Sequence, residues 1–84
     1  MQTVIFYTKL NCSECDEAYR LLMDLTYDTP LEIDMIDVTH AHNYELKLKY
    51  ENRIPVITTP HAKTELQWPF NIAEIKAYLT NEAT

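Results

Sequence analysis

The sequence predicts an α/β fold, in which a four-stranded mixed sheet is flanked by helices in the order β-α-β-α-β-β-α. Three observations support this: a β-branched and aromatic run at 3–7, an apolar stripe at three- and four-residue spacing between 13 and 27, and two short strand-like segments near the end that are close enough for a hairpin. The first two strands are joined through a helix, so we expect them to be parallel with a right-handed crossover. A chain of 84 residues predicts one domain, spanning 1–84.

The first half of the chain alternates strands with helices. The run at 3–7 has few polar interruptions, which predicts a strand buried on both faces. A helix follows and ends before Pro30, with acidic residues in its first turn and Asn11 or Ser13 as its expected cap. Residues 31–38 alternate apolar and acidic side chains, as in a strand with one wetter face. A second helix is expected from about 40 to 50, with Tyr44 and Leu48 on its apolar face.

The second half predicts a hairpin and a final helix. Residues 55–59 favour a short strand, 60–62 a turn, and 63–67 an edge strand. The chain has no glycine, so turns that need a positive φ must use Asn, Asp or strain. The last helix is expected from about 71 to 79, and its inward side chains are Ile72, Ile75, Tyr78 and Leu79.

Charge and composition exclude several classes of function. The formal net charge of −6 makes nucleic acid and anionic membrane surfaces poor partners, because both carry negative charge. No segment has the run of apolar residues that a membrane span needs, and no basic region followed by an apolar run opens the chain. We therefore expect a cytoplasmic location. The absence of glycine excludes nucleotide-binding glycine-rich loops.

Two cysteines, Cys12 and Cys15, stand three positions apart. A bridge between them closes almost no loop, so structural stabilisation is a poor reason for the pair. Redox chemistry or metal binding remains. Half of a zinc site, completed by His40, His42 or His61, is the rival hypothesis, but surface histidines near a helix start are more often simply polar, so we predict no metal.

The position of the pair at the start of the first helix favours redox chemistry. Unpaired N–H groups and the helix dipole at that end stabilise a thiolate, which is the attacking species in disulfide exchange. We therefore assign Cys12 as the exposed nucleophile and the deeper Cys15 as the resolving thiol. Lys9 adds positive charge near Cys12, whereas Glu14 opposes ionisation, so we expect a reducing potential.

A second element of the site is the segment from Arg53 to Val56. A proline that opens a short strand is unusual unless its missing N–H faces an open edge of the sheet. A cis bond between Ile54 and Pro55 would turn the Ile54 backbone toward the sulfurs, where it could pair with an extended substrate. Spacing alone leaves a trans turn proline equally open.

The run from Val4 to Cys15, including Tyr7-Thr8-Lys9 before the paired cysteines, resembles the opening of a glutaredoxin. Ile54-Pro55-Val56 falls where that family has its cis-proline, and Trp68-Pro69-Phe70-Asn71 resembles the ending of a short glutaredoxin-like family. The resemblance implies the thioredoxin-like fold, a cis Pro55, and the roles given above for the two cysteines. The Gly-Gly turn and the acid that bind glutathione are replaced here, so we predict no bound cofactor, with glutathione left as an alternative.

These residues together predict a thiol–disulfide oxidoreductase. We place Lys9, Ile54, Pro55 and Trp68 at its substrate-binding surface. Its substrate is expected to be a disulfide-containing protein or a small thiol, and its electron donor a thioredoxin reductase or glutathione. The alternative is a peptide-binding module of the same fold with little redox turnover. Replacing both cysteines would leave binding by such a module unchanged.

Overall fold

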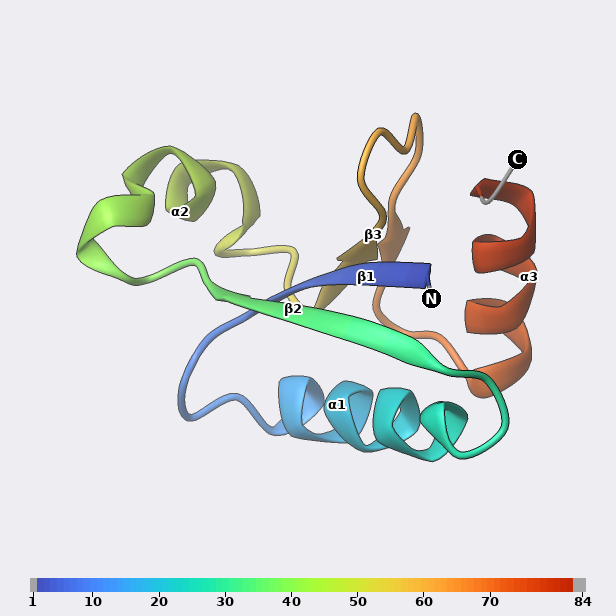
Figure 1. The fold of residues 1–84 in the computed structure, drawn as a ribbon. Helices are drawn as coiled ribbons and strands as arrows, with labels where there is room; N and C mark the ends of the chain where they lie inside the picture. Colours follow the sequence, from blue (N-terminus) through green and yellow to red (C-terminus); the bar gives the residue numbers. More distant parts are fainter. Residues whose placement is uncertain (1, 83–84) are drawn as a thin grey trace.

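The computed structural model describes residues 2–82, and its sheet has four strands in the order β2-β1-β3-β4 (Figure 1). Strand β1 (Gln2–Thr8) lies between β2 (Leu31–Asp37) and β3 (Val56–Thr58), parallel to the first and antiparallel to the second. Strand β4 (Leu66–Gln67) pairs antiparallel with β3. The predicted mixed sheet and the predicted parallel pairing of the first two strands are confirmed.

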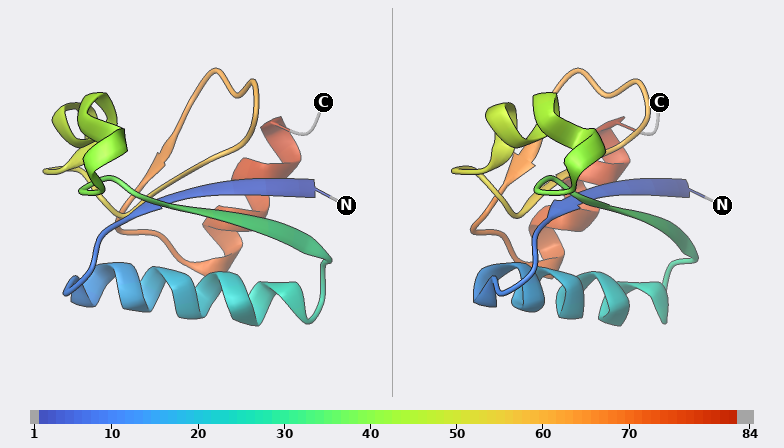
Figure 2. Two further views of the ribbon diagram at one scale, coloured as in Figure 1. Left: turned by 60° about the vertical axis from the view of Figure 1, so that its left-hand side comes forward. Right: turned by 90° about the vertical axis from the view of Figure 1, so that its left-hand side faces the viewer.

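The helices are distributed unevenly over the sheet. Helices α1 (Ser13–Thr26) and α3 (Ile72–Glu82) pack on one face, whereas the 3₁₀ turn η1 (Ala41–Asn43) and helix α2 (Tyr44–Tyr50) lie at one end of the molecule on the other side (Figures 1 and 2). The face that carries α1 and α3 holds the main core.

Within residues 2–82, no helix is both long and apolar enough to cross a bilayer.

That core is built from alternate residues of β1 and the apolar stripes of α1 and α3. Val4 and Phe6 of β1 are fully buried, as are Leu22 of α1, Ile57 of β3 and Ile75 of α3. Burying one such side chain stabilises the fold by about 1.5–3 kcal/mol. Leu22 belongs to the stripe predicted for the first helix, and Ile75 to that of the last. Both stripes are confirmed, and they fix the start of α1 beside the end of β1.

The opposite face of β1 is only half-buried, so the prediction of a strand buried on both faces is wrong. The strand alternates between buried and intermediate positions along its whole length. The one well-covered part of this face is a small cluster in which Tyr7, Val38, Tyr50 and Val56 meet. It is small because α2 is short and lies over only one end of the sheet (Figure 2).

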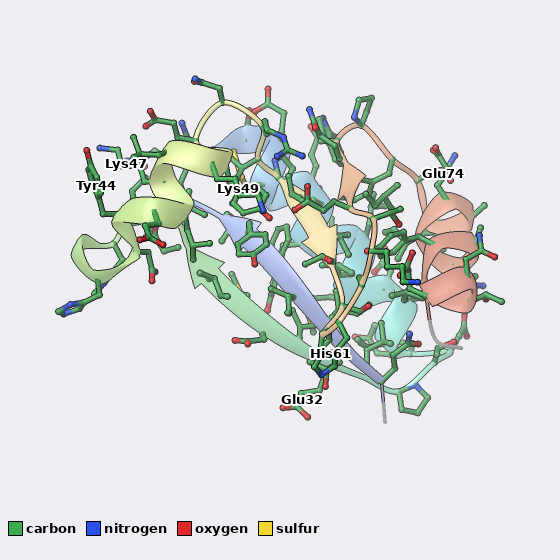
Figure 3. All side chains as sticks on the ribbon, turned by 90° about the horizontal axis from the view of Figure 1, so that it is seen from above. Glu32, Tyr44, Lys47, Lys49, His61 and Glu74 are labelled. Atoms are coloured by element: carbon green, nitrogen blue, oxygen red, sulfur yellow. A yellow bond between two sulfur atoms is a disulfide. The ribbon has the colours of Figure 1, made fainter. Side chains whose placement is uncertain are left out.

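Helix α2 presents a different side to the protein from the one predicted. Tyr44 and Leu48 are 65% and 63% exposed, and Tyr44 lies on the outer side of the helix (Figure 3). Leu46 and Tyr50 pack inward instead. The helix begins only after the 3₁₀ turn η1, so an apolar spacing counted from residue 40 selects the wrong face.

Other differences lie at the ends of elements. The predicted edge strand 63–67 pairs only over Leu66–Gln67, and α3 continues to Glu82. Met35 is half-exposed because β2 is an edge strand. Among residues 2–82, two have a positive φ, Asn11 at 58° and His61 at 67°. Asn11 fits the expectation for a chain without glycine, and His61 is a residue that the expectation did not include.

Candidate active site

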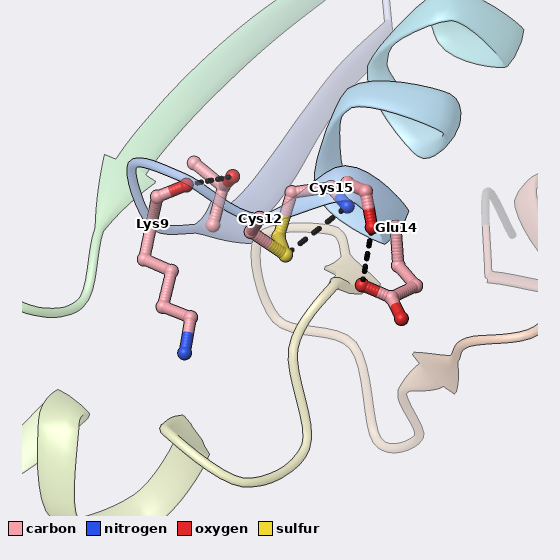
Figure 4. Close-up of a disulfide and its surroundings, with 6 residues drawn as sticks. Lys9, Cys12, Glu14 and Cys15 are labelled. Atoms are coloured by element: carbon pink, nitrogen blue, oxygen red, sulfur yellow. Dashed lines mark hydrogen bonds between the residues drawn. A yellow bond between two sulfur atoms is a disulfide. The ribbon is translucent and has the colours of Figure 1, made fainter.

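Cys12 and Cys15 form a disulfide at the amino end of α1 (Figure 4). Their Cα atoms are 5.2 Å apart, within the usual range for a disulfide. Cys12 is the N-cap of the helix, and its Sγ accepts the backbone N–H of Cys15 at 3.2 Å. The sulfur of Cys12 therefore already faces one of the unpaired donors of the first turn, as the sequence predicted.

The cap itself differs from the prediction, which named Asn11 or Ser13. Asn11 instead occupies the left-handed turn that leads into the helix, and the Ser13 hydroxyl donates to Glu14 Oε2 at 3.2 Å. With Asn11 in the left-handed turn and the Ser13 hydroxyl on Glu14, the sulfur of Cys12 takes the capping position. A thiolate there gains from the same N–H groups that an oxygen cap would satisfy.

The two sulfurs are more enclosed than expected. Cys12 is 8% exposed and Cys15 is 2% exposed, so the prediction of an exposed nucleophile is wrong in degree. The order of the two residues agrees with the assigned roles, because Cys12 keeps the larger accessible edge. The apolar side chain of Leu10, 79% exposed, stands two residues before it. The exposure of Leu10 was not predicted, although an apolar residue in a polar loop is visible in the sequence.

The two charged residues predicted to act on Cys12 lie at the surface. In Figure 4 the Lys9 side chain extends away from the two sulfurs, and Lys9 is exposed. The carboxylate of Glu14 is held by Ser13 on the outer side of the first turn. Both therefore act on Cys12 through solvent-screened charge and not by direct contact.

The segment before β3 lies against the end of β1, where the cysteine loop begins. The antiparallel pairing of Tyr7 with Val56 brings Pro55 beside Thr8. The Ile54–Pro55 bond is cis, as the glutaredoxin resemblance implied. The Ile54 N–H, however, donates to the Tyr50 carbonyl at 3.0 Å, which corrects the expectation that it would be free for a substrate. Among residues 2–82, no backbone donor reaches the Ile54 carbonyl, which stays available.

Trp68 is tied to the same segment. Its backbone N–H donates to the Pro55 carbonyl at 3.1 Å, and its ring meets Phe70 edge-on with centroids 5.0 Å apart. The half-buried ring also borders a groove of about 280 Å³ along α1, lined by Glu17, Arg20, Leu21, Asp24 and Trp68 itself. The structure thus brings Trp68 and Pro55 together beside the cysteine helix.

The start of α3 bears on whether glutathione fits. Asn71 and Glu74 form a reciprocal capping box: the Glu74 N–H donates to Asn71 Oδ1 at 2.8 Å, and the Asn71 N–H donates to Glu74 Oε1 at 3.1 Å. A carboxylate of the protein therefore already occupies the donor at this helix end. A ligand carboxylate arriving there would be repelled by the Glu74 charge, which disfavours a glutathione carboxylate at this end.

The histidines are not grouped with the cysteines. His40 caps η1 and His42 belongs to it, with their ring centroids 5.3 Å apart, whereas His61 is in the turn between β3 and β4. In the part of the chain that the structure describes, no three His, Cys, Asp or Glu side chains are arranged to hold a metal ion.

A mixed sheet with a cysteine pair at the start of its first helix and a proline before its third strand defines the class of thioredoxin-like and glutaredoxin-like proteins. The family model for the Glutaredoxin-like domain (DUF836) matches residues 3–80, and the chain belongs to that family.

Solved structures agree on the fold. A structural genomics target protein from X. campestris is 24% identical, with 93% of this chain and 96% of that chain covered and a TM-score of 0.76. Oxidised thioredoxin O2 from Arabidopsis thaliana is 14% identical, with 96% and 74% covered and a TM-score of 0.69. No curated protein matches the chain significantly. The glutaredoxin-like resemblance and the thioredoxin-like fold are therefore confirmed, and the cysteine pair fits a redox role.

Proposed function

We propose that this protein is a thiol–disulfide oxidoreductase in which Cys12 attacks and Cys15 resolves. The observation that carries the proposal is the disulfide at the amino end of α1, with the Cys12 sulfur on the N–H of Cys15. That N–H and the helix dipole stabilise the thiolate of Cys12, so Cys12 ionises more readily than a free thiol in water. Cys15 is the more enclosed of the two and already lies beside the Cys12 sulfur, which suits the resolving step.

The exchange balances as a two-electron reaction. The Cys12 thiolate attacks one sulfur of a substrate disulfide, and the departing sulfur leaves as a thiolate that takes up a proton. Cys15 then loses its proton and attacks Cys12, which releases the second substrate thiol and leaves the Cys12–Cys15 disulfide. A dithiol or a reductase must return two electrons to the protein. Because Glu74 already occupies the start of α3, we propose a protein or dithiol donor in place of glutathione.

Reduction of a model peptide disulfide, with dithiothreitol as donor, tests the proposal. Cys12→Ser should abolish turnover, and Cys15→Ser should accumulate a mixed disulfide with the peptide at Cys12. A chain with both cysteines replaced that binds the peptide as well as the wild type, while the wild type shows no turnover, would instead support the peptide-binding module. Rapid reduction of the oxidised protein by glutathione alone would contradict the proposed donor class.

A further inference from the structure

A polar cluster joins α2 to the hairpin on the side of the sheet opposite α1 and α3. Its members, which we call the Glu65 cluster, are Tyr50, Arg53, Glu65 and Gln67. The Tyr50 hydroxyl donates to Glu65 Oε2, and Arg53 Nη2 donates to Glu65 Oε1 at 2.7 Å. Arg53 Nε also donates to Gln67 Oε1 at 3.2 Å. One carboxylate thus receives donors from two positions of another segment.

The cluster borders the segment that faces the cysteine loop. Arg53 comes directly before Ile54, Tyr50 lies four residues before it, and the Ile54 N–H donates to the Tyr50 carbonyl. On the other segment, Glu65 and Gln67 precede Trp68, whose N–H donates to the Pro55 carbonyl. Side-chain bonds at one end and a backbone bond at the other therefore join 50–55 to 65–68.

Tyr50 is the rigid part of this connection. Its residue is 3% exposed, and its ring stacks on Tyr7 of β1 with centroids 4.2 Å apart. The cations of Lys49 and Arg53 lie 5.1 and 5.2 Å from the same ring, and Lys49 is labelled in Figure 3. Removing the acceptor of a hydroxyl on a buried ring costs more free energy than removing that of an exposed hydroxyl, because the buried donor is left without a hydrogen bond. Glu65 therefore connects an ordered aromatic pair on the sheet to the side chain of Arg53.

The ion pair alone would be a weak device. The side chains of Arg53 and Glu65 are 36% and 24% exposed, and partly exposed pairs contribute little to stability. The ion pair therefore matters more for the position of the nearby backbone than for the stability of the fold. It fixes the backbone between Arg53 and Pro55, where the Ile54 carbonyl is available to a substrate and its N–H is not.

We propose that Glu65 is a positioning residue for disulfide exchange: by holding Tyr50 and Arg53, it sets the Ile54 carbonyl where an extended substrate backbone donates to it beside Cys12. This inference rests on the proposed function. It predicts that the protein selects disulfides carried on extended polypeptide over small disulfides that have no backbone N–H. Glu65 itself touches neither sulfur nor substrate.

The test compares two substrates in the variant Glu65→Gln, which keeps the shape of the side chain but removes its charge. The substrates are a model peptide disulfide and hydroxyethyl disulfide, and Glu45→Gln, at an exposed position of α2, is the matched control. We expect the KM for the peptide to rise about fivefold, the loss of roughly one hydrogen bond. The kcat for the peptide, the redox potential and the rate with hydroxyethyl disulfide should stay at wild-type values, and Glu45→Gln should change none of them.

A second variant keeps the test open if Glu65→Gln folds poorly. Tyr50→Phe retains the stacked ring and removes only the hydroxyl, and it should raise the peptide KM in the same selective way. Equal losses on both substrates in both variants, or no change in the peptide KM, would overturn the role of Glu65 while leaving the proposed function intact. A wild-type protein that reduces neither disulfide would reject the proposed function itself.

Discussion

The backbone N–H of Trp68 donates to the carbonyl of Pro55 at 3.1 Å, so the exit of β4 and the entry to β3 are joined at the end of the sheet that holds the cysteines. Trp68 is the only tryptophan of the chain, and its ring borders the groove along α1. Its fluorescence therefore reports on this surface alone.

We expect Trp68→Ala to raise the KM for a peptide disulfide by more than it raises that for hydroxyethyl disulfide, because the ring supplies contact area to a bound chain. In a protein with both cysteines replaced by serine, adding the peptide should change the Trp68 fluorescence. Unchanged fluorescence at saturating peptide, together with equal effects on both substrates, would remove Trp68 from the binding surface. Tyr44→Ala, on the outer side of α2, is the control for loss of an aromatic ring elsewhere.

Two leucines on different helices separate core from surface. Leu22 is fully buried in the main core, whereas Leu48 is 63% exposed on α2. Leu22→Ala should lower the free energy of unfolding by about 2–5 kcal/mol, and Leu48→Ala should change it by less than about 0.5 kcal/mol. Urea unfolding of both variants measures this. A large loss with Leu48→Ala would restore the apolar face that the sequence predicted for the second helix.

The sequence predicted the fold class because strong local patterns and the order of elements agree. The stripe containing Leu22 and Leu25 defines α1, and Ile75 with Leu79 defines α3. Helix α2 could not be predicted as well, because its phase is set by η1 and by the stacking of Tyr50 on Tyr7. Such a contact between residues distant in the chain leaves no periodic signal.

The cysteine pair and the cis-proline segment of the candidate site were predictable, whereas the Glu65 cluster was not. The spacing of Cys12 and Cys15 and the strand before them were sufficient to place the pair at a helix start. The Glu65 cluster depends on the hairpin folding back toward α2, so no residue near Arg53 in the sequence predicts its pairing with Glu65. The capping box of Asn71 and Glu74, in contrast, has a local signature at a three-residue spacing that could have been read.

That capping box makes a stability prediction. Asn71→Ala removes the oxygen that accepts the Glu74 N–H, which should cost about 1 kcal/mol and lower the Tm by roughly 4–8 °C. Asn52→Ala, in the exposed turn after α2, should change the Tm little. Thermal unfolding followed by circular dichroism measures both. Equal shifts in the two variants would mean that the cap contributes nothing of its own.

Asp37 makes the stability depend on acid. Its carboxylate accepts from the Thr39 hydroxyl at 2.6 Å and from the Thr39 N–H at 2.8 Å, and these bonds hold its pKa below the ordinary value. The unfolded chain then binds this proton more readily, so the contribution is complete above about pH 4 and disappears as the pH falls through the lower folded pKa. Asp37→Asn should therefore destabilise the protein at neutral pH, and its difference from the wild type should shrink as the pH falls through the lowered pKa of Asp37. Asp34→Asn, exposed on the same strand, is the matched control for loss of a carboxylate charge.

Glu14 tests how far screened charge sets the redox chemistry. Its carboxylate lies between the two cysteines in the sequence and is held on the surface by Ser13. Glu14→Gln removes a negative charge near Cys12. This removal stabilises the Cys12 thiolate, so the Cys12–Cys15 disulfide should be easier to reduce and its reduction potential should rise. A tenfold change in the exchange equilibrium corresponds to about 30 mV, which we take as the upper limit because the group is exposed. Equilibration with a dithiol buffer at low salt measures the shift, and high salt should narrow it. Asp28→Asn, beyond the far end of α1, controls for net charge, and a shift as large as that of Glu14→Gln would show that position near the sulfur is irrelevant.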